Sequence, residues 1–190
     1  MKKCNLRRKL LVIVAVFCLT LALFVTGCGG DEDDDLGILM QLEFILLAPG
    51  NTAYSVRGVA GTGNVVVIPA VYNDKPVTHI INYGFYNQPI IRVTIPEGIV
   101  QIGSFSFARS LLTSVNIPNS VTTIGSRAFR NDLESVTSIL IGEDVITRQS
   151  LGVQGSDHSF GNGFDNFYRD NERLAGRYTF SNGSWNFSPR

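Results

Sequence analysis

The chain has 190 residues with 16 basic and 16 acidic side chains, so its formal net charge at pH 7 is zero. This length is typical of one domain with short accessory segments. Because nucleic-acid-binding proteins need a clustered basic face, the balanced charge argues against a nucleic-acid partner.

Residues 1–27 are predicted to form a signal peptide. Five basic residues precede an apolar run from Leu10 to Val25 that only Thr20 interrupts, and small residues follow it. This order is typical of secretory signals. The stretch Val25-Thr26-Gly27-Cys28 resembles the lipobox of bacterial lipoproteins, which implies cleavage before Cys28 and a lipid on that cysteine. The alternative is an uncleaved membrane anchor in which Cys28 is incidental.

Residues 28–35 are predicted to be a lipidated cysteine and an acidic tether. Without the signal, 11 basic and 16 acidic residues remain, and the excess lies entirely in Asp31-Glu32-Asp33-Asp34-Asp35. Such a run is solvated and self-repelling. It also resembles the acidic export tags of some Gram-negative lipoproteins, which implies the outer membrane or cell surface rather than the inner membrane. Cys4 and Cys18 leave with the signal, so no disulfide is available.

Residues 36–50 are predicted to cover one end of the fold. The stretch from Leu36 to Ala48 is apolar nearly all round, Asp35 can act as an N-cap, and Pro49-Gly50 stops the segment. We expect a short helix here, with a buried strand as the alternative. A segment lying on the membrane is a third possibility, but the basic residues that usually mark one are missing.

Residues 51–150 contain a repeat with a period of 22. Ile95-Pro96 returns as Ile117-Pro118, and Phe107 returns as Phe129. Each unit has an alternating strand ended by proline, a second short strand, and a turn that carries a phenylalanine inward. Since so short a unit cannot bury its own apolar face, the copies must stack into a solenoid. The extra residues Tyr72 to Pro76 are predicted to bulge from the first coil as a loop.

The pattern L-T-S-V-x-I-P-x-S-V-T-x-I-G-x-x-A-F, seen almost entire from Leu112 to Phe129, resembles the BspA-like leucine-rich repeats. The stretches 54–58 and 167–178 are similar to repeat proteins of this type from oral and gut bacteria and treponemes. The resemblance implies a short right-handed leucine-rich-repeat coil of about 3.5 repeats, mostly β with helical turns. One departure is that Gln88, Ser110 and Asp132 stand where many such repeats have cysteine, so this edge should be looser or more polar.

Residues 151–190 are predicted to form a loop and a C-terminal β-hairpin cap. Asn182-Gly183 is the favoured pair for a tight two-residue turn. That register pairs Tyr178 with Phe187 and Phe180 with Trp185, with all four rings on one face. We expect the rings to cover the end of the coil; the alternative is an aromatic platform for a sugar.

We predict that the chain is not an enzyme. His79 occupies an outward strand position and should be solvated. His158 lies beside Ser156, Asp157 and Ser159, but the members of a hydrolase triad come from distant segments. No spacing of Cys and His suits a metal, and no cofactor motif is present.

The predicted binding surface is the outward face of the first strands, which is small, nearly uncharged and rich in hydroxyls. The resemblance implies a surface lipoprotein of the adhesin or host-interaction type, whose members are reported to bind extracellular-matrix proteins. The alternative is a structural protein that packs against other envelope proteins. The ligand and the oligomeric state stay open. The candidate residues are Arg92, Thr94, Ser114, Asn116, Ser138 and Leu140.

Overall fold

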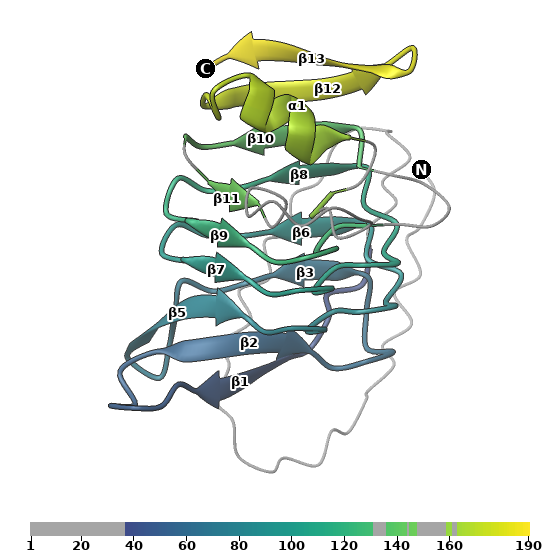
Figure 1. Cartoon of the computed structure of the whole chain (residues 1–190). Helices are drawn as coiled ribbons and strands as arrows, with labels where there is room; N and C mark the ends of the chain where they lie inside the picture. The colour runs from purple at the N-terminus through teal and green to yellow at the C-terminus, as the bar shows by residue number, and fades with distance from the viewer. Residues whose placement is uncertain (1–36, 131–135, 144, 148–158, 161–162) are drawn as a thin grey trace, which may run out of the picture. The chain divides into compact units, whose positions relative to one another are not determined.

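Each repeat forms one coil, and each coil contributes one strand to each of two opposite sides of the stack (Figure 1). The structure is a computed structural model, and it describes residues 37–130, 136–143, 145–147, 159–160 and 163–190. Strands on the first side are β2 (Tyr54–Gly58), β5 (Lys75–Ile80), β7 (Gln101–Ile102), β9 (Thr123–Ile124) and β11 (Ile146–Thr147). Strands on the second side are β3 (Val65–Val67), β6 (Arg92–Thr94), β8 (Ser114–Asn116) and β10 (Ser138–Ile141).

The register between neighbouring coils follows the repeat. His79 lies beside Gln101, and Gln101 beside Thr123, in parallel strands. On the other side Ser138 pairs with Ser114 in the same sense. The predicted repeat solenoid is therefore confirmed, and it has about three turns.

The core lies between the two sides and repeats with the same period. Ile95 and Ile117 are buried from one side, and Ile102 and Ile124 from the other. A third column, here called the phenylalanine column, fills the turn edge with rings stacked face to face. Its members are Phe85, Phe107, Phe129 and Phe160, with centroid distances of 4.9, 5.3 and 4.8 Å.

The turns that carry these rings were predicted to be helical; they contain single i→i−3 hydrogen bonds, such as Ser106 to Gly103 and Ala108 to Phe105, but form no regular helix. In the turns, the amide of Phe85 donates to the carbonyl of Ser106, and that of Phe107 donates to Ala128, each in the next coil. An amide that donates between coils cannot also donate into a helix of its own. Phe105 and Arg127 accordingly adopt positive φ values.

The N-terminal segment forms a strand, so the helix prediction is wrong and the strand alternative is correct. β1 (Leu42–Leu46) pairs antiparallel with β2. It is half-buried rather than fully buried, because Glu43 and Ile45 point outward while the alternate residues face the coil. Pairing satisfies the backbone groups at the end of the sheet, which a helix lying there would leave open.

The inserted stretch from Tyr72 to Pro76, predicted to be a loop, is part of a short antiparallel strand pair. β4 (Val71–Tyr72) pairs antiparallel with the start of β5, and Asn73 and Asp74 form the turn at positive φ. The Tyr72 ring stacks on Phe44 of β1 at 3.9 Å and meets Tyr54 edge-on at 5.1 Å. The insertion thus packs against the N-terminal strand.

The other end of the stack carries a helix and a hairpin. β12 (Gly176–Ser181) and β13 (Ser184–Pro189) pair in the predicted register, Tyr178 with Phe187 and Phe180 with Trp185. The helix α1 (Phe164–Asp170) falls in the stretch predicted to be a loop and was missed. Together α1, β12 and β13 are called the C-terminal cap. Within the described part of the chain, no helix is long and apolar enough to cross a bilayer.

Candidate binding surfaces

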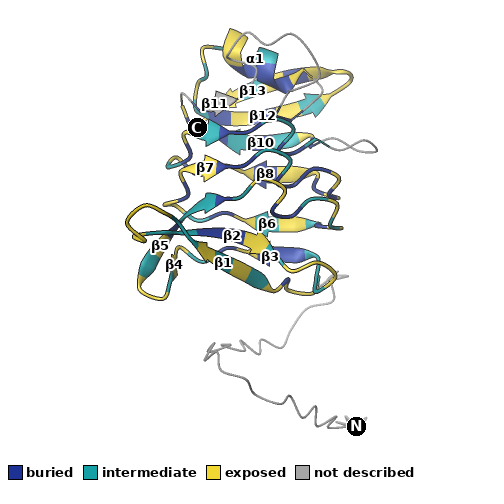
Figure 2. Ribbon diagram, turned by 60° about the horizontal axis from the view of Figure 1, so that its bottom comes forward, coloured by how far each residue is buried: buried dark blue, intermediate teal, exposed yellow. Residues whose placement is uncertain are grey.

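The outward side chains of β6, β8 and β10 form a continuous strip, here called the polar face. Arg92, Thr94, Ser114 and Asn116 are all exposed, because side chains alternate along a strand and their neighbours Val93 and Val115 turn inward. Figure 2 shows this alternation as exposed colouring along β6 and β8. The structure therefore places four of the six predicted residues at the surface.

Ser138 and Leu140 are half-buried and depart from the prediction of a fully outward position. The reason is β12, which pairs antiparallel with β10 and sets Thr179 opposite Ser138 and Arg177 opposite Leu140. The Arg177 guanidinium donates to the Ser138 hydroxyl at 3.3 Å. Long side chains from the hairpin thus partly cover the last strand of the coil.

The hairpin also lengthens the polar face. This extension was not predicted from the sequence. Its alternate residues Arg177 and Thr179 on β12, and Asn186 and Ser188 on β13, are exposed. By register, Thr179 and Asn186 continue the row of Ser114 and Ser138. The signal was present in the sequence: once Asn182-Gly183 fixes the turn, inward aromatics at every second position force polar residues outward.

The four hairpin rings turn toward the body of the protein. Tyr178 is fully buried and Trp185 is 7% exposed, while Phe180 and Phe187 are half-buried. Phe164 of α1 meets Trp185 at 4.9 Å and Tyr178 at 5.4 Å. Burial raises the pKa of Tyr178 to about 12, and its hydroxyl donates to the Leu174 carbonyl. This packing leaves little ring surface for a sugar.

His79 is half-buried, so the prediction of a solvated side chain is wrong. It lies between Ser55 of β2 and Gln101 of β7, and the Thr78 hydroxyl is 2.7 Å from its Nδ1. Burial lowers the pKa of His79. The described part of the chain brings no group of three or more potential metal ligands together. His158 and Cys28 lie outside the described residues.

Ser159, the last residue of the triad-like stretch, is held by hydrogen bonds that involve Asp165. The amides of Ser159 and Phe160 donate to the two carboxylate oxygens of Asp165 at 3.1 and 3.2 Å. The Ser159 hydroxyl donates to the Ile124 carbonyl. The buried carboxylate thereby fixes the segment that brings Phe160 into the phenylalanine column.

The edge predicted to be more polar, where many such repeats have cysteine, is polar at Gln88 and Ser110. Ser110 is buried, and its hydroxyl has no hydrogen-bond partner. Gln88 is half-buried and accepts from the Gly61 amide at 3.3 Å. Asp132 lies outside the described residues.

A stack of short parallel strands with an exposed polar side is an architecture that repeat proteins commonly use for binding. The family described as BspA type leucine rich repeat region matches residues 71–151, in six copies. The chain therefore contains a BspA-type leucine-rich repeat region over residues 71–151. Proteins of this type are generally non-enzymatic binding scaffolds and typically surface or secreted bacterial proteins.

Two solved structures are similar to parts of the chain. A leucine-rich repeat protein from Bacteroides capillosus is 23% identical over 41% of this chain and 78% of that one, with a TM-score of 0.33. The T. pallidum leucine-rich repeat protein is 23% identical over 48% of this chain and 64% of that one, with a TM-score of 0.29. Among the curated proteins, none matches the chain.

Proposed function

We propose that the chain is a lipid-anchored protein of the bacterial cell envelope that binds a protein partner through its polar face, in adhesion or in contact with host or matrix proteins. The observation that carries this proposal is the polar face itself. It continues from β6 through β8 and β10 onto the hairpin, with exposed side chains on each strand.

The chemistry of the polar face suits a neutral partner surface. Among its outward residues only Arg92 and Arg177 are charged, and the others are mainly hydroxyls and amides. Such side chains form hydrogen bonds with backbone and polar groups and need little charge complementarity. Because the strands hold them in a fixed register, less side-chain and loop freedom is lost on binding than with a flexible loop.

The proposed anchor is Cys28 with the acidic tether behind it. We expect Cys28→Ser to abolish lipid attachment, since stable anchoring needs more than one acyl chain and no other site offers itself. Partition of the full-length protein between detergent and aqueous phases measures this. Equal partition of the variant and the parent chain would favour an uncleaved N-terminal anchor instead.

Binding through the polar face is tested with paired charge insertions. Ser114→Arg with Asn116→Arg should weaken capture of host matrix proteins by the immobilised full-length protein at least tenfold. Gln101→Arg with Thr123→Arg is the matched control, because these residues lie at outward positions of β7 and β9 on the opposite side. Equal loss in both variants, or loss in neither, would remove the polar face from the proposal.

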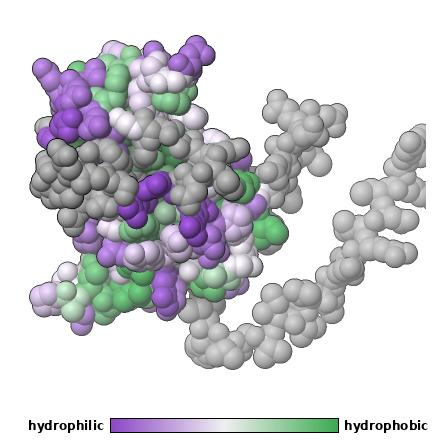
Figure 3. Space-filling model, turned by 45° about the vertical axis from the view of Figure 1, so that its right-hand side comes forward, coloured by the Kyte–Doolittle hydropathy of each residue, from purple (hydrophilic) through white to green (hydrophobic). Residues whose placement is uncertain are grey.

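A structural role, in which the repeats only pack against other envelope proteins, is the second candidate. Figure 3 shows hydrophobic side chains gathered at the lower end of the view, where β1 and the first coil lie. Ile38 and Leu39, which precede β1, and Val71 of β4 are 70, 64 and 58% exposed. Protease shaving of intact cells separates the two roles, because it removes a surface adhesin and spares a periplasmic protein.

A further inference from the structure

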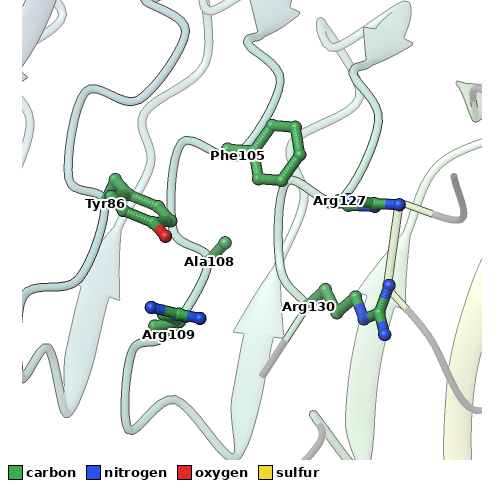
Figure 4. Close-up of a pocket in the computed structure, with 6 residues that line it drawn as sticks. All are labelled: Tyr86, Phe105, Ala108, Arg109, Arg127 and Arg130. Carbon is green, nitrogen blue, oxygen red and sulfur yellow. The ribbon is translucent and has the colours of Figure 1, made fainter. Parts of the chain in front are cut away.

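Six side chains on the turn edge of the coils surround a hollow, here called the arginine hollow. Its volume is about 230 Å³ (Figure 4). It lies on a different edge of the coils from the polar face, and no part of the proposed function uses it. The lining residues are Tyr86, Phe105, Ala108, Arg109, Arg127 and Arg130.

The arginine hollow exists because one column of the repeat is interrupted by a small residue. Tyr86, Ala108 and Arg130 are spaced by 22 residues and occupy equivalent positions in three successive coils. Hydrogen bonds from the Asn87 amide to Ala108, and from the Arg109 amide to Arg130, hold these coils at strand spacing. Where its neighbours have a ring and a guanidinium, Ala108 has one methyl group. In Figure 4 Ala108 lies between Tyr86 and Arg109 on one side and Arg127 and Arg130 on the other.

Among the described residues that line the arginine hollow, the charged ones are all arginines. In the turn segments 81–90, 103–112 and 125–130, the charged residues are Arg109, Arg127 and Arg130. A concave site lined by one sign of charge concentrates the field and raises the local concentration of counter-ions. Each of these arginines also has another interaction within the protein, so an incoming anion would share the guanidinium with an existing contact.

Aromatic rings hold two of the guanidiniums in place. The Arg109 carbon Cζ lies 5.8 Å from the centre of the Tyr86 ring, and that of Arg127 lies 5.4 Å from the Phe105 ring. Phe105 is itself stacked on Tyr83 at 5.0 Å. A guanidinium over a ring uses its face for this contact, while its N–H donors lie in its plane and match the oxygens of an oxyanion. Fixing the side chains in advance lowers the cost of binding.

We propose that the arginine hollow binds a single oxyanion group, a sulfate, phosphate or carboxylate, either free or carried on a small ring such as a sulfated monosaccharide. Guanidiniums bind these groups through paired, charge-assisted hydrogen bonds. The volume of the hollow, about 230 Å³, is below the range of about 300–1,000 Å³ that is usual for drug-sized ligands, so one substituted ring is the largest ligand expected.

The test is a titration of the full-length protein followed by the NMR shifts of the amides and arginine side chains in residues 105–130. Sodium sulfate is compared with sodium chloride at equal ionic strength, and glucose 6-sulfate with glucose. We expect saturable shifts with the sulfate-bearing compounds and none with chloride or glucose. Saturation by inorganic sulfate itself identifies a free anion site; saturation by glucose 6-sulfate alone identifies a sugar-borne group. Shifts of equal size with chloride would overturn the proposal, as would no shift with either sulfate compound.

Variants separate a specific site from general charge. Arg109→Gln with Arg130→Gln should weaken binding at least tenfold, and Ala108→Leu should do the same without any change in charge. The column already carries larger side chains at Tyr86 and Arg130, so circular dichroism of the Ala108→Leu protein should match that of the parent. Arg169→Gln with Arg92→Gln, at exposed positions on α1 and β6, also removes two positive charges; it is the charge-matched control and should bind as the parent does. Undiminished binding by Ala108→Leu, in a protein that keeps its fold, would contradict the proposal.

Discussion

Phe107 is the residue on which the stacking of the coils depends most directly. It is fully buried, with parallel rings on both sides, Phe85 at 4.9 Å and Phe129 at 5.3 Å. Phe107→Ala should therefore lower the free energy of unfolding by about 3–5 kcal/mol. Urea denaturation measures this, with Thr94→Ala on the exposed side as a control expected to change it by less than about 0.5 kcal/mol. A larger loss at Thr94 would mean that the inward and outward phases of the repeat are exchanged.

Tyr178 gives a residue-scale prediction with a pH dependence. Its pKa is raised to about 12 by burial, so the neutral phenol is favoured in the folded protein. A tyrosine whose charged form is disfavoured in the folded protein contributes stability at pH values below its pKa in the unfolded chain, which is about 10. That contribution is lost as the pH rises toward 12. Absorbance titration should show a tyrosine component that ionises late and together with unfolding. In Tyr178→Phe this late component should be smaller by one tyrosine, and an unchanged component would assign it to another tyrosine.

At the scale of single elements, Glu97 adds hydrogen bonds between the second and third coils. Its carboxylate accepts hydrogen bonds from the amides of Asn119 at 3.2 Å and Ser120 at 3.1 Å. Desolvation raises the pKa of Glu97, but these amides, the Ser120 hydroxyl and the charge of Arg190 outweigh it and lower the pKa below its ordinary value.

We therefore expect part of the acid sensitivity of the protein to come from Glu97. A carboxylate whose pKa is lowered by folding stabilises the protein at pH values above its pKa in the unfolded chain. That stabilisation is lost as the pH falls through its pKa in the folded protein. Glu97→Gln should give a flatter loss of stability between neutral and acidic pH, measured by thermal melting. An unchanged pH profile, or a Glu97 pKa at its ordinary value by NMR titration, would contradict this assignment.

The elements that sequence reasoning predicted are those with local chemical reasons. Proline ends the first strands at Ile95 and Ile117, and Asn182-Gly183 fixes the hairpin register. β1 was assigned wrongly because residues 36–48 are apolar nearly all round, so periodicity cannot separate helix from strand. Phe160 was missed because it follows Phe129 by 31 residues rather than 22, and only the tertiary structure shows that it completes the column.

On the scale of the whole molecule, the C-terminal cap decides whether the last coil is protected. The hairpin covers Ile139 and Ile141 of β10, while its inner rings pack on Phe164. Deleting residues 174–190 should lower the melting temperature and the solubility, because the apolar end of the solenoid meets water. Trp185 is the only tryptophan, so its emission in the intact protein should be blue-shifted. Red-shifted, readily quenched emission would mean that the rings are open and available to a ligand.

The candidate sites could be predicted only in part, for a reason that belongs to the whole molecule. The outward positions of β6 and β8 follow from the period alone. The arginine hollow does not follow from the period, because it depends on which residues of three coils share one column. Ala108 lines a hollow only because it lies between the larger side chains of Tyr86 and Arg130. The half-burial of Ser138 likewise comes from Arg177, which lies 39 positions away in the sequence.

The phenylalanine column shows how the length of this protein can be set. Four rings lie nearly parallel, at 4, 10 and 8° to one another, and then Phe164 meets Phe160 at 70°. A parallel ring leaves a face that accepts another copy of itself, whereas an edge-on ring does not. A duplicated 22-residue unit placed before Phe160 would therefore add one more parallel ring to the column. A unit placed after Phe160 would not, because Phe164 meets that ring edge-on. A lineage that gains or loses such units would change the extent of its binding surface in steps of one strand, while both ends of the molecule stay as they are.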